Sequence, residues 1–373
     1  MCVWKSSLKT RSVKGIGSMI SGKDIHVMDL SKRVVIGPDV VDRIMEFMPR
    51  NLRCARKYFI VTGPNVWRLY GEKLEKAIGA GNATVEVFKA TTAHIEIAEQ
   101  IIDEARRFGA EVLIGFGGGK CIDLAKYSAK NLDKPFISVP TTASHDGIAS
   151  PFASLKGTDK PTSIKAVEPV LIVADTSIIA SSPRRLLIAG AGDVIAKFTA
   201  VLDWRLAHLL RNEYYGDYAA SLALHSAKHI VRYSDVIAKS KEQAVRIVLE
   251  ALISSSFAMC IAGSTRPASG SEHLFSHALD LIAPKPALHG EQTGVGTIMM
   301  AKLHRLKWKR IRRVLRKIGA PVTAKELGIP EDLIIKALTM AHKIRPERYT
   351  ILGDRGLTWE AAERLARETG VIP

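Results

Sequence analysis

Two patterns of hydrophobic residues divide this chain. Between about residues 32 and 178, short apolar runs rich in β-branched residues alternate with longer amphipathic stretches. We expect strands over Arg33–Ile36, Tyr58–Thr62, Ala83–Phe88, Val112–Phe116, Phe136–Val139 and Val170–Ala174, and helices over Val66–Ala77, His94–Phe108 and Lys120–Lys130. Strands that alternate with helices of this length form parallel βαβ units. Because the strand runs are almost wholly apolar, helices should cover both faces of the sheet.

The second half of the chain has the periodicity of long helices. From about Ser182 onward, we expect helices over Val194–Leu210, Tyr218–Ile230, Lys241–Cys260, Glu272–Leu281, Gly294–Ile318 and Asp332–Lys343. The sequence thus predicts an N-terminal extension over residues 1–22, an α/β nucleotide domain over residues 23–180 and an all-α domain over residues 181–373. Active sites commonly lie in the cleft between two such domains.

Length and composition are those of a globular protein. The chain has 373 residues, of which 47% are hydrophobic and 24% charged. Its longest uncharged apolar stretch, Ala251–Thr265, is shorter than the roughly 20 apolar residues that span a membrane, so we expect no span. No apolar block follows the basic residues of the first 22, which argues against a secretory signal. Four cysteines without CxxC spacing favour a reducing compartment, and we expect a cytoplasmic protein.

The charge is strongly basic and partly concentrated in one segment. The net charge is +17, and the segment KLHRLKWKRIRRVLRK, from Lys302 to Lys317, contains no acid. Such a run can bind nucleic acid, in which case binding to duplex DNA would be sensitive to salt. However, apolar residues recur in it at helical spacing, which favours an amphipathic helix with a solvated basic face. We therefore expect no nucleic-acid partner, and a positive field that attracts an anionic substrate.

A glycine-rich segment lies at the junction of a predicted strand and a predicted helix. In EVLIGFGGGKCIDLAKYSA, this junction holds Gly115, Gly117, Gly118 and Gly119. Glycine lets the backbone approach a pyrophosphate closely, and the following helix offers free N–H groups at the positive end of its dipole. The spacing is neither GxGxxG nor GxxxxGK(S/T). A structural turn is the alternative, but the position after an apolar strand favours phosphate binding.

A second polar segment, VPTTASHDGIASP, also follows a predicted strand. It is rich in hydroxyl residues and contains His145 and Asp146. These groups could hold ribose or phosphate oxygens, although a polar surface loop would have a similar composition. Ligands of α/β proteins bind at the carboxyl ends of parallel strands, so we favour a binding role.

Three polar motifs interrupt the apolar helical half. GAGDVIAK places Asp193 at the start of a predicted helix, SEHLFSHALD places His273 and His277 on one helix face, and LHGEQ places His289 just before a helix. One aspartate with two or three histidines is a normal ligand set for zinc or a similar divalent ion. Each residue also has a structural interpretation, since Asp193 could be an N-cap and the histidines a packed pair.

Taken in order, these motifs resemble the superfamily of dehydroquinate synthases, glycerol dehydrogenases and iron-type alcohol dehydrogenases, and within it the archaeal glycerol-1-phosphate dehydrogenases. The matching segments are GFGGGKCIDLAKYSA, VPTTASHDGIASP, GAGDVIAKFTAVLDW, GSEHLFSHALD, LHGEQTGVGT and IRPERYTIL, which cover roughly residues 28–373. The resemblance implies a dehydroquinate synthase-like fold, in which an α/β Rossmann-like domain precedes an all-α metal-binding domain.

The resemblance also implies roles for individual residues. The cofactor would be bound by Gly117, Gly118, Gly119, Lys120, Cys121, Asp123, Thr141, Thr142, Ser144 and Ser150. The metal ligands would be Asp193, His273 and His289. Substrate would contact Asp146, Asp193 and His277, of which Asp193 and His277 would be catalytic. The basic run matches no motif of this family, and residues 1–22 lie outside the resemblance.

The implied reaction is reduction of dihydroxyacetone phosphate by NAD(P)H to sn-glycerol 1-phosphate, the backbone of archaeal ether lipids. Zinc would act as a Lewis acid, and NAD(P)H would supply the hydride. The main alternative is a glycerol dehydrogenase that uses unphosphorylated polyols, whereas a dehydroquinate synthase would need more basic residues around its substrate. We expect a homo-oligomer. No acid follows the predicted strand TVEVF until Glu96, so NADPH should be accepted at least as well as NADH.

Overall fold

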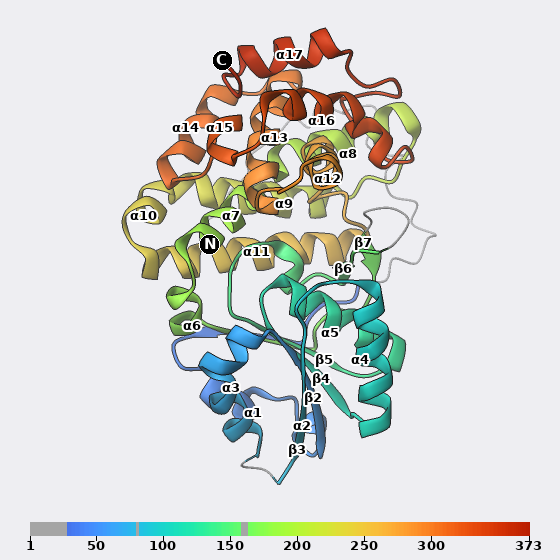
Figure 1. Cartoon of the computed structure of the whole chain (residues 1–373), viewed down its shortest axis with the longest axis vertical. Coiled ribbons are helices and arrows are strands. Elements are labelled where there is room, and N and C mark those ends of the chain that lie inside the picture. The colour runs from blue at the N-terminus through green and yellow to red at the C-terminus, as the bar shows by residue number, and fades with distance from the viewer. Residues whose placement is uncertain (1–27, 80–81, 158–162) are drawn as a thin grey trace, which may run out of the picture.

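A computed structural model describes residues 28–79, 82–157 and 163–373 of the chain (Figure 1). The predicted extension over residues 1–22 lies outside the described residues. The first half contains a parallel sheet in the order β1-β8-β5-β4-β2-β3. Its strands are β1 (Arg33–Gly37), β2 (Lys57–Thr62), β3 (Thr84–Lys89), β4 (Val112–Gly117), β5 (Phe136–Pro140) and β8 (Leu171–Asp175). All six predicted strands are confirmed, with shifts of one residue at their ends.

The sheet is covered on both faces because its strands are apolar on both. Along β2, Phe59 and Val61 pack into one core with α4 (Ile95–Phe108) and α5 (Gly119–Leu132). The alternate residues Tyr58 and Ile60 pack into a second core with α3 (Pro64–Gly79). In Figure 1, α4 and α5 lie on one side of the sheet and α1 (Ile44–Phe47) and α3 on the other. This alternation is the expected result of the period-two geometry of a strand.

The second half is helical and lies beyond the carboxyl ends of the strands (Figure 1). Its helices are α7 (Arg184–Ile195), α8 (Lys197–Arg211), α9 (Asp217–Arg232), α10 (Ser234–Lys239), α11 (Lys241–Ala262), α12 (Ser271–Ile282), α13 (His289–Leu303), α14 (Trp308–Ile318), α15 (Ala324–Leu327), α16 (Glu331–Ile344) and α17 (Trp359–Glu368). Helix α12 packs against α13 and α16, and α13 packs against α7. The small helix α6 (Thr176–Ser181) connects the sheet to this half.

Two predicted helices are each divided in the structure. The helix expected over Val194–Leu210 is two helices that meet at Ala196, so Asp193 lies in the last turn of α7 and not at the start of a helix. The prediction was wrong because the glycines of the GAG segment lower helix propensity, and packing of α7 against α13 overrides that preference. The helix expected over Gly294–Ile318 breaks after Leu303, where Arg305 takes a φ of 56°.

Several short elements had no clear signal in the sequence. The strands β6 (Phe152–Ser154) and β7 (Ser163–Lys165) form a two-stranded antiparallel sheet beside the main one.

Among the described residues, α11 is the one helix that is long and apolar enough to cross a membrane. However, 72% of its most apolar window is buried in the protein, as expected for a core helix.

Candidate metal centre and dinucleotide-binding turn

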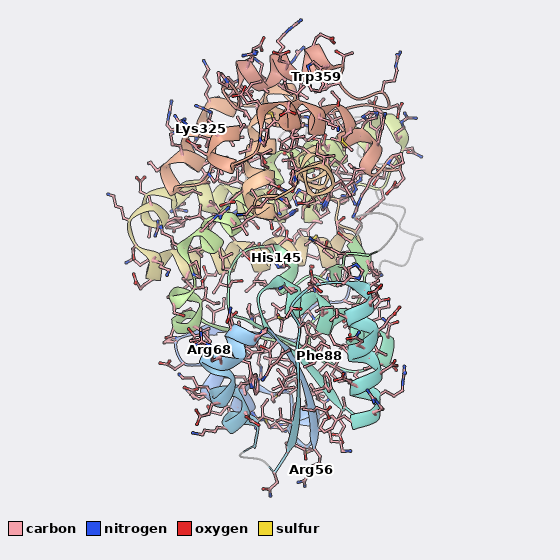
Figure 2. All side chains as sticks on the ribbon, in the orientation of Figure 1. Arg56, Arg68, Phe88, His145, Lys325 and Trp359 are labelled. Carbon is pink, nitrogen blue, oxygen red and sulfur yellow. The ribbon has the colours of Figure 1, made fainter. Side chains whose placement is uncertain are left out.

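The two predicted cofactor loops lie against each other. The glycine turn joins β4 to α5, and the Thr141 amide donates to the Gly117 carbonyl oxygen at 2.9 Å. His145 lies directly over Gly119, where a Cβ would come within 1.7 Å of its Nε2 atom. Figure 2 places His145 between the sheet and the helical half. The two loops therefore form one surface above the N-terminus of α5, a suitable place for a pyrophosphate.

The other predicted cofactor residues differ in how they face this surface. Lys120 lies at the start of α5 and donates to the Thr91 carbonyl oxygen, and Thr142 and Ser144 share a hydrogen bond of 3.3 Å. The Cys121 side chain is buried beneath the turn, and burial raises the pKa of its thiol to about 11. Of these predicted cofactor residues, Lys120, Thr142 and Ser144 are therefore less buried than Cys121.

Asp123 and Ser150 point inward and brace the second loop. Asp123 accepts hydrogen bonds from buried Lys126 at 3.1 Å and from the Ser154 amide at 3.2 Å. Lys126 also donates to the carbonyl oxygens of Gly147 and Phe152, each at 2.7 Å. The side chain of Ser150 is almost fully buried. Both side chains therefore support the shape of the loop and are not exposed on its surface.

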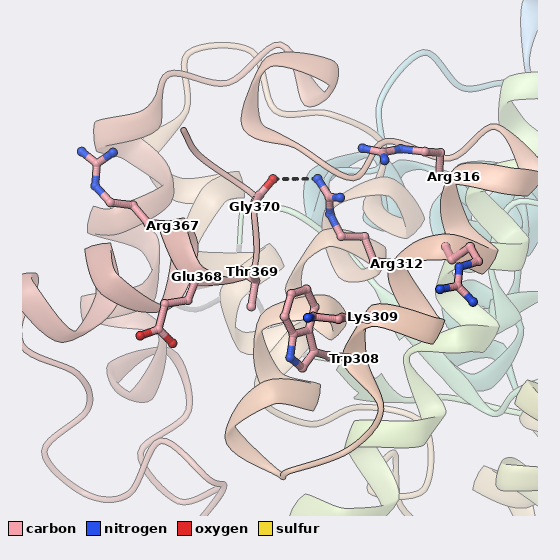
Figure 3. Close-up of a pocket in the computed structure, with 9 residues that line it drawn as sticks. Trp308, Lys309, Arg312, Arg316, Arg367, Glu368, Thr369 and Gly370 are labelled. Atoms are coloured by element: carbon pink, nitrogen blue, oxygen red, sulfur yellow. Dashed lines mark hydrogen bonds between the residues drawn. The ribbon is translucent and has the colours of Figure 1, made fainter.

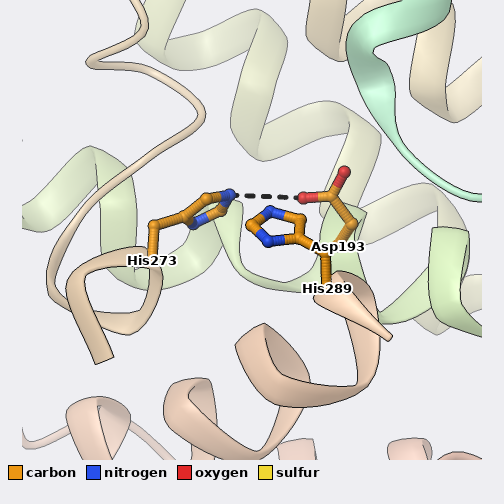
Figure 4. Close-up of side chains that lie close together, drawn as sticks. All are labelled: Asp193, His273 and His289. Carbon is orange, nitrogen blue, oxygen red and sulfur yellow. Dashed lines mark ion pairs between the residues drawn. The ribbon is translucent and has the colours of Figure 1, made fainter. Parts of the chain in front are cut away.

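The three predicted metal ligands converge in the helical half. Ligand atoms of Asp193, His273 and His289 all lie within 4.8 Å of one another, and Figure 4 shows their side chains directed toward a common point. They come from the end of α7, the first turn of α12 and the first residue of α13. One carboxylate and two imidazoles match the zinc preference, with room for an oxygen ligand from substrate.

Two glycines set the distance between two of these ligands. Gly192 precedes Asp193, and a Cβ on it would lie 2.3 Å from the Gly290 carbonyl oxygen. Gly290 follows His289, and a Cβ on it would lie 1.8 Å from the Ala189 carbonyl oxygen. Any side chain at either position would separate α7 from α13. The helices therefore touch backbone to backbone, which brings Asp193 and His289 within reach of one ion.

Glu272 holds His273 in its ligand orientation. Its buried carboxylate lies 2.8 Å from His273 Nδ1 and accepts from the Gly270 amide at 2.7 Å and the Thr199 hydroxyl at 2.5 Å. His273 Nε2 is thereby directed to Asp193, 3.5 Å away. Carboxylate–histidine pairs of this kind fix the tautomer of metal-ligating histidines. The sequence prediction did not include Glu272, although its position beside His273 was a usable signal.

Lys197 connects the metal centre to the loop after β5. Its fully buried ammonium lies 2.8 Å from Asp193 Oδ1 and 2.8 Å from Asp146 Oδ2. Burial alone would lower the pKa of Lys197, but the two carboxylates outweigh it and raise that pKa. Burial would likewise raise the pKa of Asp193, yet Lys197 and His273 hold it well below its usual value. The sequence prediction did not include this lysine.

Burial favours the neutral ring in both of the remaining histidines, His289 and His277. Burial lowers the pKa of His289 to about 3, so its ring is neutral and able to bind a metal. His277 lies one turn beyond His273, with Nδ1 3.6 Å from Asp280 Oδ2, and burial also lowers its pKa. Its ring centroid is 5.7 Å from that of His289. His277 therefore adjoins the predicted metal position without belonging to the Asp193–His273–His289 group.

Comparisons with known proteins show the family to which this chain belongs. Residues 35–183 match the iron-containing alcohol dehydrogenase family. The chain is 57% identical to a glycerol-1-phosphate dehydrogenase (NAD(P)+) of Hyperthermus butylicus, over 93% of this chain and 99% of that protein. It is 56% identical to the Staphylothermus marinus protein of the same name, over 94% and 99%. The chain belongs to the glycerol-1-phosphate dehydrogenase family.

Solved structures confirm the fold of this glycerol-1-phosphate dehydrogenase family member. A probable glycerol dehydrogenase from Sinorhizobium meliloti superposes with a TM-score of 0.76 at 18% identity, covering 94% of this chain and all of that one. Glycerol dehydrogenase from Schizosaccharomyces pombe gives a TM-score of 0.74 at 22% identity, covering 92% and 90%. The predicted α/β sheet followed by a helical half is therefore the dehydroquinate synthase-like arrangement.

In this family member, the part of the basic run from Trp308 to Lys317 lies on α14, whereas Lys302 belongs to the last turn of α13 and Arg305 to the connection between the two helices. The apolar residues Ile311, Val314, Leu315 and Ile318 of α14 are buried, which confirms the predicted amphipathic helix. Between α14 and the end of α17 lies a cavity of about 380 Å³, which Figure 3 shows with Arg312 donating to the Gly370 carbonyl oxygen at 2.9 Å. The lining of this cavity contains none of the residues predicted to bind cofactor, metal or substrate.

Proposed function

We propose that this chain reduces dihydroxyacetone phosphate to sn-glycerol 1-phosphate with NAD(P)H, and so supplies the backbone of archaeal ether phospholipids. The observation that carries the proposal is identity above 50% over nearly the whole chain to proteins named for this activity. The Asp193–His273–His289 group and the glycine turn supply the two binding functions that such a reaction needs.

Asp193, His273 and His289 would hold one divalent ion, for which we propose zinc. The neutral His289 ring, the ionised Asp193 carboxylate and the Glu272-oriented His273 ring are the ligand forms that zinc requires. When bound, the ion acts as a Lewis acid toward the carbonyl group of the substrate. The protein fixes the ligand positions through the α7–α13 contact and so orients the ion for one substrate geometry.

Asp146 and His277 would orient the substrate beside this centre. The Asp146 carboxylate is held by Lys197 and by the Ser255 hydroxyl at 3.1 Å, so its position is fixed before substrate arrives. The His277 ring has one nitrogen beside Asp280, and the second is assigned to a substrate hydroxyl. The glycine turn and the loop that follows β5 would bind the dinucleotide from the sheet side.

A coupled assay tests the proposal. Rates with dihydroxyacetone phosphate and dihydroxyacetone are compared in protein stripped of metal and after zinc is restored. We expect activity to depend on zinc and to favour the phosphorylated substrate. Preference for dihydroxyacetone would instead support a glycerol dehydrogenase. A homo-oligomer in the cytoplasm is part of the same proposal, and light scattering of the purified protein tests the assembly.

A further inference from the structure

Arg345 is a buried cation without an acidic partner. It follows the last residue of α16, and its side chain is only 7% exposed. Within the described parts of the chain it forms no ion pair: its Nη2 atom donates to the Ser163 hydroxyl at 3.4 Å, and its Nε atom has no partner. Nε and Nη2 lie on one edge of the guanidinium, the edge that binds two oxygens side by side. A buried guanidinium left without a counter-charge is costly, so this position favours an anion.

Ion pairs neutralise several other cations of the helical half, among them the buried Lys197 and Arg266 and the exposed Arg185. Lys197 lies between two aspartates. Arg185 binds Glu291 through two hydrogen bonds of 2.6 and 2.7 Å. Arg266 forms a similar double contact with Glu213, with 2.6 Å from Nε. Each of these side chains forms an ion pair, whereas Arg345 forms none among the described residues, and the carboxylate of Glu347 acts on it only from beyond ion-pairing distance.

Arg348 adds a second positive charge behind Arg345. It donates to the Ser269 carbonyl oxygen at 2.6 Å and to the Thr265 hydroxyl at 2.7 Å, and neither acceptor carries a charge. Burial, reinforced by the charges of Arg345 and Arg266, lowers the pKa of Arg348 to about 9. The two guanidiniums thus leave a net positive charge in a buried place.

The helix that Arg345 follows packs against one of the helices of the candidate metal centre. Helix α16 packs along α12, the helix that carries His273 and His277. The charge of Arg345 also acts on His277, where it adds to the effect of burial in lowering the pKa. Ser163 belongs to β7 in the first half of the chain. Arg345 therefore lies where α12, α16 and the β6–β7 sheet meet, at the junction of the two halves.

We propose that Arg345 binds the phosphate group of the substrate through its Nε and Nη2 atoms, with the Ser163 hydroxyl as a further donor and Arg348 as a supporting charge. A planar guanidinium matches two phosphate oxygens and remains charged when buried. The inference rests on the proposed function, because it needs a phosphorylated substrate at the Asp193–His273–His289 centre. It makes Arg345 the residue that separates dihydroxyacetone phosphate from dihydroxyacetone.

Steady-state kinetics of Arg345→Met and Arg345→Lys with both substrates test this assignment. In the Met variant we expect the KM for dihydroxyacetone phosphate to rise about 10- to 100-fold, because one or two charge-assisted hydrogen bonds are lost. The preference for the phosphorylated substrate should fall by a similar factor. The Lys variant keeps the charge without the paired donors and should lie between the wild type and the Met variant. Arg313→Met, on the exposed face of α14, is the matched control and should behave as the wild type.

Each outcome bears on one of the two proposals. If the wild-type enzyme has no preference for the phosphorylated substrate, the proposed function fails. If it has that preference and Arg345→Met retains it, only the phosphate assignment is overturned. If kcat/KM falls equally with dihydroxyacetone phosphate and dihydroxyacetone, Arg345 has a structural role and the phosphate assignment is overturned. Should the Met variant not fold, Ser163→Ala replaces it, with an expected smaller rise in the KM for dihydroxyacetone phosphate alone. An unchanged KM in that variant and in Arg345→Lys would also overturn the assignment.

Discussion

The backbone amide of Asp146 donates a hydrogen bond to an Asp193 carboxylate oxygen over 3.1 Å. Asp146 lies in the loop that follows β5, and Asp193 lies in the last turn of α7. This bond therefore joins the predicted cofactor loop to a predicted metal ligand. The Lys197 ammonium reinforces the link by bridging both side chains. A change in the position of Asp193 should therefore also displace the loop that is predicted to bind the dinucleotide.

Loss of Lys197 should destabilise the metal-free protein. In Lys197→Met, two buried carboxylates lose their counter-charge, which costs about 3–5 kcal/mol of unfolding free energy. Bound zinc should restore part of this loss, because it places positive charge beside Asp193. Thermal unfolding with and without zinc measures both effects. The control is Lys73→Met, which removes an exposed ion pair and should change stability by less than about 0.5 kcal/mol. Equal melting temperatures for the two variants would contradict the prediction.

His289 and His277 should have separable roles. In His289→Ala, one of three protein ligands is lost, so metal content and turnover should both collapse while the fold persists. In His277→Ala, metal should remain and kcat/KM should fall about 10²–10⁴-fold, the usual contribution of a group in proton transfer. Metal analysis of the purified variants beside kinetics distinguishes them. Equal metal loss in His273→Ala and His277→Ala would show that this division is wrong.

Glu272 should tune the metal affinity without touching the ion. In Glu272→Gln, the partner of His273 Nδ1 loses its charge, and zinc affinity should fall about 10- to 100-fold. Competition with a chromophoric chelator measures the affinity. Glu360→Gln, at the start of the exposed helix α17, is the control and should leave zinc binding unchanged. A Glu272→Gln affinity equal to the wild type would remove Glu272 from the metal site.

The metal-free protein should lose stability in acid because of His289. Its pKa is lowered from 6.5 to about 3, so between these values the unfolded chain binds a proton that the folded chain does not. Stability should therefore fall as the pH falls through this window, by up to about 1.4 kcal/mol per pH unit. The pKa of Asp193 is also lowered in the folded protein, so stability should fall further once the pH drops below 3.8, the pKa of this carboxyl group in the unfolded chain. His273 has a raised pKa and the opposite sign, since its contribution is present below 6.5 and lost at higher pH.

Denaturant unfolding of the metal-free wild type and His289→Gln at several pH values tests that slope. Between pH 6.5 and 3, the unfolding free energy of the variant should decrease less steeply with falling pH than that of the wild type. The two slopes should differ by up to about 1.4 kcal/mol per pH unit. Parallel curves for the two proteins would mean that His289 does not titrate as its burial requires.

NADPH should be accepted at least as well as NADH. The strand next to the glycine turn is β2, which ends in Thr62 and is followed by Gly63, and β3 ends in Lys89, so neither strand end carries an acid. In Gly63→Asp, the new carboxylate should repel the 2′-phosphate of NADPH, so the variant should prefer NADH. We expect kcat/KM for NADPH to fall roughly tenfold or more. A Cβ at Gly63 meets only Cys121 Sγ at 3.9 Å, so the substitution fits. Strong discrimination against NADPH in the wild type would show that another residue reads the ribose.

The features that were predictable from the sequence are those that local chemistry determines. Each strand of the sheet is a continuous apolar run, and the glycine turn stands between a strand and a helix. Asp193, His273 and His289 were also predictable, because one aspartate with two histidines is a common ligand set for zinc. In contrast, the roles of Lys197 and Glu272 depend partly on partners that lie far away in sequence, Asp146 and Thr199 respectively, in addition to their local contacts with Asp193 and His273. The same holds for Arg345, because its burial without an ion pair is a property of the packed structure and has no signature in a single sequence.

The backbone contact between Gly192 and Gly290 fixes the distance between two of the predicted metal ligands. The gap between Asp193 and His289 is set by peptide groups that meet directly, with no side chain between them. Peptide groups have no rotamers to exchange, whereas a gap filled by side chains can widen or narrow as these repack. Substitutions in the surrounding core, or heating, can loosen the packing around the helices before they alter the bite of the chelate. The ion-binding geometry should therefore be among the last features of the native state to be lost.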